Sequence, residues 1–366
     1  MSTLPTSFDP EQDPEITESN STTLSVVTSK REASLVTSKR ESSLVTSKHD
    51  PLRDAMIAEV KRGLTSKPKT LSPWLFYDAQ GSKLFERITM LPEYYPTRTE
   101  RGIFAGYADG ILERARGGRG GKLRIAELGS GTATKTGILL AAAVRAQTTV
   151  QYLPVDVSAS AMEEACVSIG RSLTGVHVIP QVANYTSEPL NLPSHDGPTL
   201  MLYIGSSIGN FDPVEALQLL SSVRSQLKPG DALLLGTDMV KAPATLIAAY
   251  NDGDGVTEAF NLNVLRRLNR ELGASFDLAA FRHVALWNER QSRIEMHLES
   301  TRAQYARIPS ISMNLHFDAG ERIHTENSYK FTVDSLSKLI TEAGFAVEEM
   351  WMDEKRWFAV TMGRVI

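Results

Sequence analysis

The clearest pattern that could do chemistry is a short glycine-rich turn with an acidic residue further along the chain. Gly129 and Gly131 follow an apolar stretch that contains Glu127, and a helical pattern starts soon after them. Glycines at the end of a strand let the backbone approach a ligand closely, and a helix N-terminus favours polar or anionic groups. Asp156 ends the next apolar stretch, where a carboxylate can accept hydrogen bonds from both hydroxyls of a ribose. The pattern predicts a site for a nucleoside-containing cofactor.

The third position of this turn separates two kinds of cofactor. A dinucleotide site calls for Gly-x-Gly-x-x-Gly, whose last glycine allows tight packing of the helix on the strand. Thr134 occupies that position here. The threonine disfavours a nicotinamide cofactor and suits S-adenosylmethionine, which has no pyrophosphate. An ordinary tight turn followed by an acid at a strand end is the alternative that involves no ligand.

The elements that must position these residues alternate between strands and helices. Apolar runs predict strands at residues 123–128, 150–156, 176–181, 199–204 and 231–236. Helical spacing predicts helices at residues 52–61, 135–146, 159–173 and 213–226. Strands and helices that alternate in this way predict an α/β fold, a Rossmann-like, doubly wound parallel sheet.

The pattern changes in the last third of the chain. A helix is expected at residues 250–272, followed by strands of an antiparallel sheet at 284–300, 308–317 and 322–331. A helix at 333–343 and an apolar run at 357–362 then return to the first pattern. We therefore expect a β-rich lobe inserted into the sheet domain. The predicted parts are a tail (1–50), the start of the lobe (51–98), the sheet core (99–241), the inserted lobe (242–330) and the end of the core (331–366).

Composition excludes several classes of protein. The 39 Lys and Arg against 43 Asp and Glu give a net charge of −4, which argues against nucleic acid or an anionic membrane as a partner. A single cysteine, Cys166, allows neither an internal disulfide nor a cysteine-based zinc site, and the 7 histidines show no metal-ligand spacing. We expect no membrane span or secretory signal, no metal, and a cytoplasmic monomer that acts on a small molecule.

The first fifty residues differ from the rest. Residues 1–48 contain 19 Ser or Thr and one aromatic residue, Phe8, so they cannot bury enough apolar surface to offset the entropy of ordering. A nine-residue unit occurs at 25–33 and 34–42, and a partial copy follows at 43–49. These features predict a disordered tail. An alternative is an arm that is phosphorylated or binds a partner, because each copy carries Thr-Ser beside a cation.

Several blocks of the chain resemble the histidine-specific Nα-methyltransferases of ergothioneine biosynthesis. The resemblance runs from about residue 51 to the C-terminus. The blocks are 76–85 (FYDAQGSKLF), 91–98 (LPEYYPTR), 127–131 (ELGSG), 205–210 (GSSIGN), 235–238 (LGTD), 260–266 (FNLNVLR), 294–296 (IEM) and 325–331 (TENSYKF). The resemblance implies transfer of three methyl groups from S-adenosylmethionine to the α-amine of L-histidine, which gives the betaine hercynine. It also implies a methyltransferase Rossmann domain with an extra β-rich substrate lobe.

On the cofactor side, the resemblance gives roles to the glycine turn and to residues around it. The two glycines would admit the methionine part, and Asp156 would bind the ribose. Lys135 matches a position beside the cofactor, with a solvated lysine in the first helical turn as the alternative. Asn184 and Tyr185 fall where the family usually shows Asp-Phe near the adenine, and the amide oxygen of an asparagine can still accept from the exocyclic amine.

On the substrate side, a strand pattern and the resemblance point to the same residues. Glu326 and Ser328 are two apart on a predicted strand and therefore share a face, while Tyr329 turns to the other. The resemblance implies that this pair binds the two nitrogens of the imidazole ring. An exposed Glu-x-Ser on a strand is the alternative without that function.

The remaining site residues rest on the resemblance alone. Asn210 and Tyr250 match a pair that binds the substrate carboxylate, and Tyr94 matches a tyrosine lining the imidazole pocket. Tyr77 and Gly205 match positions near the amine, so we expect Tyr77 and Asn210 to act in catalysis. Met296 alone would be taken as a core residue, and the resemblance places it on the pocket wall.

Alternative functions remain open. One is an N-methyltransferase for another amine, such as a tryptophan-derived one, against which Glu326, Ser328 and Met296 argue. Another is a protein that binds S-adenosylmethionine without turnover and recruits partners through its tail. A nicotinamide-dependent oxidoreductase is disfavoured by Thr134.

Overall fold

Eight strands form the largest sheet of the structure, which is a computed structural model. It describes residues 51–131, 133, 135–156, 159–183, 185, 190 and 192–366. The predicted tail with its repeats, Thr134 and Asn184 lie outside the described residues. No helix in the described ranges is long and apolar enough to cross a membrane.

The large sheet has the strand order β13-β14-β7-β6-β2-β3-β4, with β5 also paired to β3. Its strands are β2 (Arg124–Leu128), β3 (Val150–Asp156), β4 (Val176–Val178), β5 (Gln181–Val182), β6 (Thr199–Tyr203), β7 (Ala232–Asp238), β13 (Phe345–Met352) and β14 (Phe358–Val365). The strands from β4 to β7 are parallel, while β14 and β13 add antiparallel pairs at one edge. The strand order reverses between β2 and β6, and α/β sheets bind ligands at the carboxyl ends of strands at such a point.

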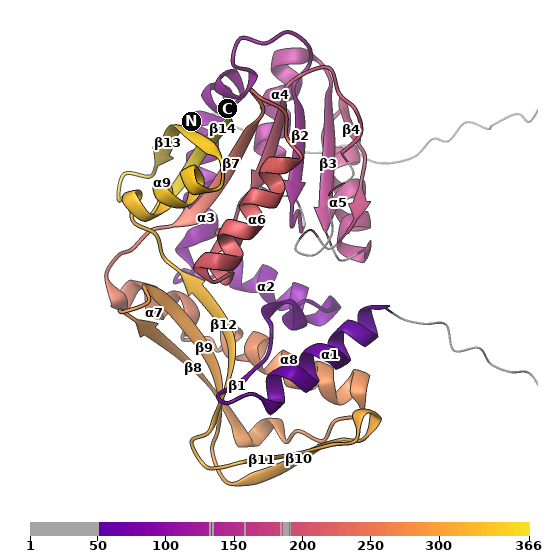
Figure 1. The fold of residues 1–366 in the computed structure, drawn as a ribbon, viewed down its shortest axis with the longest axis vertical. Helices are drawn as coiled ribbons and strands as arrows, with labels where there is room; N and C mark the ends of the chain where they lie inside the picture. The colour runs from indigo at the N-terminus through magenta and orange to yellow at the C-terminus, as the bar shows by residue number, and fades with distance from the viewer. Residues whose placement is uncertain are drawn as a thin grey trace, which may run out of the picture. The chain divides into compact units, whose positions relative to one another are not determined.

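Helices cover both faces of this sheet, as Figure 1 shows. On one face lie α3 (Tyr95–Arg116), α4 (Thr136–Gln147) and α5 (Ala159–Ser172), and on the other lie α6 (Pro213–Ser225) and α9 (Val333–Glu342). Neighbouring strand residues point to opposite faces, so Ile125 packs in the first core and Ala126 in the second. The predicted doubly wound α/β fold is confirmed.

The start of α6 illustrates how local sequence sets these boundaries. Asp212 precedes the helix, and its carboxylate accepts hydrogen bonds from the backbone N–H groups of Val214 and Glu215. The Glu215 side chain returns the contact to the backbone N–H of Asp212, which completes a capping box. Pro213 occupies the first turn, where a missing N–H costs nothing.

A second sheet lies beyond the carboxyl ends of the parallel strands (Figure 1). It has the order β1-β12-β9-β8 and a separate hairpin of two strands. The strands are β1 (Lys69–Thr70), β8 (Phe281–Asn288), β9 (Arg293–Ser300) and β12 (Arg322–Tyr329), and the hairpin is β10 (Gln304–Ile308) with β11 (Met313–Phe317). Its helices are α1 (Pro51–Thr65), α2 (Ala79–Met90), α7 (Pro243–Tyr250) and α8 (Val256–Leu272).

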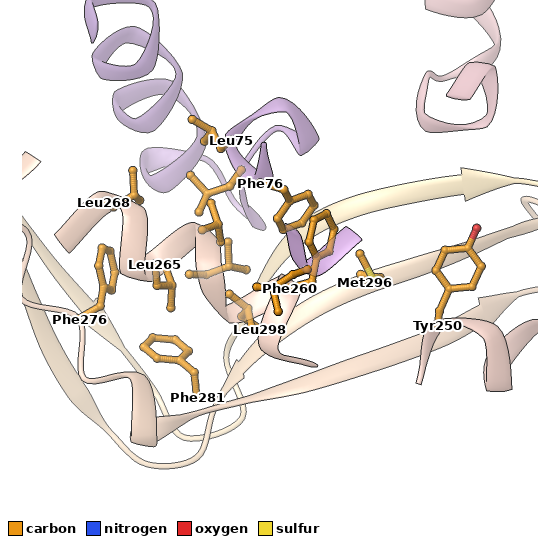
Figure 2. Close-up of a cluster of buried hydrophobic side chains, with 14 of the residues drawn as sticks. Leu75, Phe76, Tyr250, Phe260, Leu265, Leu268, Phe276, Phe281, Met296 and Leu298 are labelled. Atoms are coloured by element: carbon orange, nitrogen blue, oxygen red, sulfur yellow. The ribbon is translucent and has the colours of Figure 1, made fainter. Parts of the chain in front are cut away.

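These helices and the second sheet share one apolar core. Figure 2 shows Phe76 and Phe260 packed beside Leu265, Leu268 and Leu298. The centroids of the Phe76 and Phe260 rings are 4.6 Å apart. Met296 and Tyr250 lie at one end of this cluster in Figure 2, where the core meets a polar pocket.

Three predicted elements differ in the structure. The helix predicted at 250–272 is α8, which begins at Val256 because the Asp252 carboxylate caps it by accepting from the N–H groups of Val256 and Thr257, both at 2.8 Å. The preceding helix α7 was not predicted and meets the predicted range only at Tyr250. The strand predicted at 284–300 is the hairpin of β8 and β9. Of the strand predicted at 308–317, only Met313–Phe317 forms β11, because a 3-10 turn at Pro309–Ile311 separates it from β10, which was not predicted.

Candidate active site

A pocket between the two sheets contains every residue predicted on the substrate side. It is lined by Tyr77, Phe85, Ile88, Tyr94, Pro96, Gly205, Ser206, Ser207, Asn210, Asp238, Ala249, Tyr250, Thr257, Phe260, Met296, Glu326 and Ser328. The lining mixes aromatic rings with a few polar groups, as in a site for a small polar molecule. Residues far apart in the sequence therefore meet at one place.

The loop after β6 forms one wall of this pocket. Gly205 has a φ of +79°, and its N–H donates to the buried Glu100 carboxylate at 2.9 and 3.1 Å. A short 3-10 helix, Ser207–Asn210, then brings Asn210 to the pocket. Gly209 packs so tightly on β12 that a Cβ there would lie 2.8 Å from the backbone oxygen of Tyr329. The loop is held against the strand that carries Glu326 and Ser328.

Lys135 forms an ion pair with Glu100, whose side chain is fully buried. The ammonium also lies 3.2 Å from the position that a Cβ would take on Gly205. The alternative of a freely solvated lysine is therefore wrong, and the position beside the cofactor stays a prediction. Lys135 links the start of α4 to the loop after β6, at the point where the strand order reverses.

The glycine turn has the geometry that a close backbone approach requires. Gly129 and Gly131 have φ values of +64° and +49°, in the left-handed region that favours glycine. The N–H of Gly131 donates to the Asp156 carboxylate at 3.2 Å, and a Cβ on Gly131 would meet nothing within 4 Å. A Cβ on Gly129 would lie 3.1 Å from the Tyr185 hydroxyl. The turn, the acid and the Tyr185 hydroxyl thus lie close together, and these are the residues predicted to bind the cofactor.

Glu127 stabilises this turn from the protein interior rather than facing a ligand. Its carboxylate is 2% exposed and accepts from the Thr136 hydroxyl at 2.7 and 2.8 Å and from Tyr152. Burial raises the pKa of Glu127 to about 7, although both hydrogen bonds oppose the shift. The residue ties β2 to the first turn of α4.

Glu326 brings an isolated carboxyl group into the pocket. It pairs with Met296 across β12 and β9, just after an irregularity in the register between His324 and Glu326. Burial raises the pKa of Glu326 to about 8, against the opposing effect of the Lys330 charge. The described residues supply no hydrogen bond to this carboxyl group, so its hydrogen-bonding capacity is left for a ligand.

Tyr250 and Ser328 form a bonded pair of hydroxyl groups on the same wall. Their oxygens are 2.7 Å apart, and the Lys330 ammonium donates to both, at 2.9 Å to Tyr250 and 2.6 Å to Ser328. Lys330 also pairs with the Asp238 carboxylate at 3.0 Å. The residues predicted for the carboxylate and for the imidazole therefore touch each other here, through Tyr250 and Ser328.

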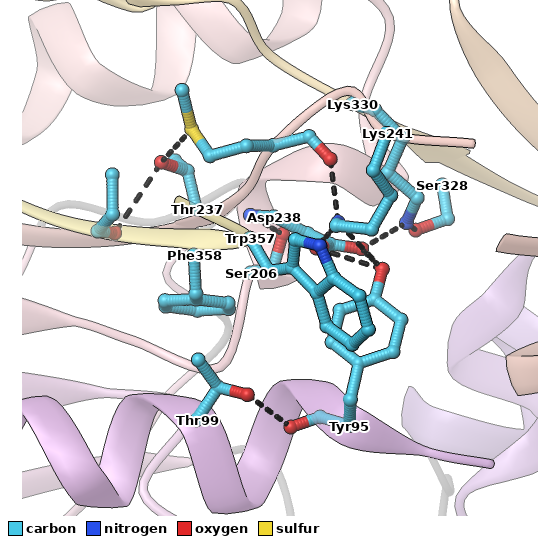
Figure 3. A network of polar contacts seen from close by, with 12 residues as sticks. Tyr95, Thr99, Ser206, Thr237, Asp238, Lys241, Ser328, Lys330, Trp357 and Phe358 are labelled. Atoms are coloured by element: carbon cyan, nitrogen blue, oxygen red, sulfur yellow. Dashed lines mark hydrogen bonds and ion pairs between the residues drawn. The ribbon is translucent and has the colours of Figure 1, made fainter. Parts of the chain in front are cut away.

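Lys330 and Asp238 were not among the predicted site residues. Figure 3 shows Lys330 beside Ser328 and directed at Asp238. The signal for Lys330 was present, because it continues the two-residue period of Glu326 and Ser328 one residue past the end of β12. A lysine on a strand usually reaches solvent, so the period alone gives it no role. Here its side chain is fully buried.

The pocket tyrosines act as hydrogen-bonding groups in their neutral form. Burial raises the pKa of Tyr94 and Tyr250 well above the usual value, and the nearby Glu326 carboxyl adds to both shifts. The pKa of Tyr77 is raised in the same direction by the surrounding protein and by Glu326, although part of its side chain reaches solvent. Tyr94 and Tyr250 meet edge to face with centroids 6.2 Å apart. Tyr77 is 38% exposed, so its ring stands at the open side of the pocket.

Within the described ranges no group of three or more His, Cys, Asp or Glu side chains could hold a metal ion. The strand order, with the glycine turn and Asp156 at the carboxyl ends of the strands, fits the Rossmann-like fold of S-adenosylmethionine-dependent methyltransferases. A family model described as "Histidine-specific methyltransferase, SAM-dependent" matches residues 56–365. The chain belongs to this histidine-specific methyltransferase family.

Curated relatives extend this match over most of the chain. A histidine N-alpha-methyltransferase of Mycolicibacterium smegmatis is 42% identical over 86% of this chain and 96% of the relative. One of Mycobacterium tuberculosis is 39% identical over 84% and 94%. Ergothioneine biosynthesis protein 1 of Neurospora crassa is 29% identical over 78% of this chain but only 32% of its own length.

Proposed function

We propose that this protein transfers three methyl groups from S-adenosylmethionine to the α-amine of L-histidine, forming hercynine, as the first step of ergothioneine biosynthesis. The observation that carries the proposal is the unpartnered Glu326 carboxyl beside the Ser328 hydroxyl, in a pocket of a histidine-specific methyltransferase. The names of the mycobacterial relatives and of the Neurospora crassa protein support the reaction and the pathway.

Recognition of the ring rests on complementary hydrogen bonds. A neutral imidazole has one N–H donor and one bare nitrogen acceptor. The carbonyl oxygen of the protonated Glu326 carboxyl can accept from the N–H, and the Ser328 hydroxyl can donate to the other nitrogen. Met296 and Tyr94 are nearly buried and line the pocket, so their side chains would pack against the ring. A ring without these nitrogens would leave buried polar groups unpaired, which is a strong basis for selectivity.

The backbone end of the substrate would be held on the opposite side of the pocket. The Asn210 amide and the Tyr250 hydroxyl can donate to the substrate carboxylate. Tyr77 is neutral, so its oxygen accepts a hydrogen from the amine rather than acting as a strong base. A free α-amine can lose its proton to solvent at modest cost near neutral pH. The residues thus contribute alignment, which is worth up to about 7–11 kcal/mol in favourable cases.

The cofactor would occupy the region around the glycine turn. When bound, S-adenosylmethionine supplies an electrophilic methyl group on a sulfonium. The backbone at Gly129 and Gly131 would hold its amino-acid part, Asp156 its ribose and Tyr185 its adenine. Asn184 is proposed for the adenine as well and lies outside the described residues, and Lys135 braces the adjoining loop through Glu100.

Three further expectations complete the proposal. The reaction stops after three transfers because a quaternary amine has neither a lone pair nor an N–H left. No metal takes part. The protein acts as a monomer in the cytoplasm, which size-exclusion chromatography and cell fractionation would check.

A related activity on tryptophan is the main alternative, and one relative, at 26% identity, is named an L-tryptophan methyltransferase of Psilocybe serbica. An indole has an N–H but no second ring nitrogen to accept from Ser328. Measuring kcat/KM for L-histidine and L-tryptophan side by side separates the two. We expect L-histidine to be favoured by at least about 10⁴, as for sites built around polar partners. Preference for tryptophan, or cofactor binding without turnover of either amino acid, would overturn the proposal.

A further inference from the structure

Lys330 is a buried cation beside the substrate pocket to which the proposed reaction gives no role. Its side chain has no exposed surface. The ammonium has three hydrogens and three acceptors around it: the Tyr250 hydroxyl at 2.9 Å, the Ser328 hydroxyl at 2.6 Å and the Asp238 carboxylate at 3.0 Å. All three acceptors belong to residues that line the pocket.

These contacts determine how the two hydroxyl groups can be used. An ammonium only donates, so both hydroxyl oxygens must accept from Lys330. Each hydroxyl therefore keeps its own hydrogen for another partner. Without substrate, one of these hydrogens bridges the 2.7 Å between Tyr250 and Ser328, and the other can find an acceptor only in the pocket that both residues line. When histidine is bound, both oxygens still accept from Lys330, so both hydrogens can turn from this bridge to the substrate.

Neutralising Asp238 does not by itself require Lys330. The Asp238 carboxylate already accepts from the Lys241 ammonium at 2.5 Å and from the Tyr95 hydroxyl at 2.7 and 2.9 Å. Figure 3 shows Lys241 and Lys330 both directed at this carboxylate. Only Lys330 also contacts the hydroxyl pair, while Lys241 makes its further contacts to Tyr95 and to the Met239 backbone oxygen.

We propose that Lys330 is a positioning residue that orients the hydroxyl hydrogens of Tyr250 and Ser328, so that this wall donates to the substrate. Glu326 provides an acceptor nearby on the same strand face. The hydrogen-bond donor on this wall and the acceptor at Glu326 together select a ring that carries one N–H and one bare nitrogen. This inference deepens the proposed function and rests on it, because it assumes that histidine occupies the pocket.

The test compares two lysines that share the same carboxylate. Lys330→Met removes the cation that touches the hydroxyl pair, and Lys241→Met is the matched control. Isothermal titration calorimetry, with S-adenosylhomocysteine present, measures the affinity of each protein for L-histidine and for L-2-thienylalanine, whose five-membered ring has no nitrogen. The ratio of the two affinities reports recognition of the ring nitrogens and cancels a general loss of folded protein.

We expect Lys330→Met to lower the ratio of histidine to thienylalanine affinity by at least about tenfold, the size expected for charge-assisted hydrogen bonding. Lys241→Met should leave the ratio within about twofold of the unaltered protein. An unchanged ratio in Lys330→Met, or an equal fall in both variants, would overturn the inference. Failure of the unaltered protein to bind histidine would instead refute the proposed function.

A second variant covers the case in which Lys330→Met does not fold. Lys330→Gln keeps most of the volume and can still donate to Asp238, and its neutral amide lacks the charge that orients both hydroxyls. Thermal melts first establish that the variant is folded. A ratio lowered about tenfold or more supports the inference, and a ratio equal to that of the unaltered protein contradicts it.

Discussion

Replacing Glu326 by alanine tests the residue on which histidine selectivity depends. The carboxyl group is buried at the pocket wall, and the described residues leave it without a hydrogen bond. In the complex the carbonyl oxygen of its protonated carboxyl would accept from a ring N–H, so Glu326→Ala removes this hydrogen bond and leaves a buried N–H unpaired. An unpaired buried donor costs about 1–3 kcal/mol. The KM for L-histidine should therefore rise by roughly 5- to 150-fold.

The cofactor site provides the internal comparison. The glycine turn and Asp156 belong to the large sheet, while Glu326 is on β12 of the second sheet. The KM for S-adenosylmethionine should then change by less than about twofold. Initial rates of S-adenosylhomocysteine release, measured with each substrate varied in turn, give both constants.

A neighbouring residue on the same strand serves as the control for this variant. Asn327 follows Glu326 on β12, is absent from the pocket lining and points to the other face of the sheet. Asn327→Ala should leave the KM for L-histidine nearly unchanged. Equal losses of histidine and cofactor affinity in Glu326→Ala, or equal effects of the two variants, would refute the assignment of Glu326.

Three other predictions address the cofactor site, the titration of Glu326 and the absence of a metal. Gly129→Val should weaken binding of S-adenosylhomocysteine, measured by calorimetry, at least about tenfold. The left-handed backbone costs a β-branched residue about 1–2 kcal/mol, and the new Cβ would lie 3.1 Å from the Tyr185 hydroxyl. An unchanged affinity would contradict the assignment of the glycine turn to the cofactor site. The pKa of Glu326 is raised from 4.5 to about 8, so the native state holds this proton more tightly than the unfolded state does. The contribution of this proton to the free energy of unfolding is therefore full below about pH 4.5 and is lost as the pH rises through about 8. Glu326→Gln should therefore show a flatter fall of Tm between pH 5 and 8, and parallel curves would contradict the shift. Dialysis against EDTA should leave the rate of histidine methylation unchanged, and loss that zinc or magnesium restores would disprove the metal-free proposal.

The sheet core could be predicted because its signals are strong and local. β3 has the predicted bounds, and β2, β6 and β7 differ from the predictions by one or two residues at their ends. These strands are continuous apolar runs, as expected for parallel strands covered on both faces. The parallel pairing of these strands then follows from their alternation with helices, while their order was not predicted.

The long helix α3, by contrast, was not predicted. Gly102, Gly106 and Gly110 lie within it, and each lowers helix propensity by about 1 kcal/mol relative to alanine. None of the three would place a Cβ within 4 Å of another group, so packing does not demand glycine there. Burial of Phe104 and Ile111 against the sheet compensates, and no local pattern reveals that contact.

The hairpin of β8 and β9 was missed for a related reason. The turn residues between the two strands, 289–292, contain neither glycine nor proline, which are the usual signals. The side chain of Asn288 closes the turn instead, accepting from the N–H of Gln291 at 3.1 Å. The alternation of apolar residues on either side then looked like one long strand.

The site residues likewise include some that the sequence could predict and some that it could not. The shared face of Glu326 and Ser328 follows from the two-residue period of a strand, and the structure places both at the pocket. Asn210 and Tyr250 come from different parts of the chain, and only the resemblance linked them. The network of Lys330 and Asp238 depends on contacts across the sheets that periodicity does not encode, and the roles of all these residues remain predictions.

The most direct test of the central claim is a time course of small molecules by mass spectrometry. Purified protein is incubated with S-adenosylmethionine and L-histidine, and the methylated products are separated and quantified. We predict that mono-, di- and trimethylated histidine appear in turn, with all methyl groups on the α-amine. Methylation of the imidazole ring, or no methylated histidine while the cofactor is bound, would contradict the account.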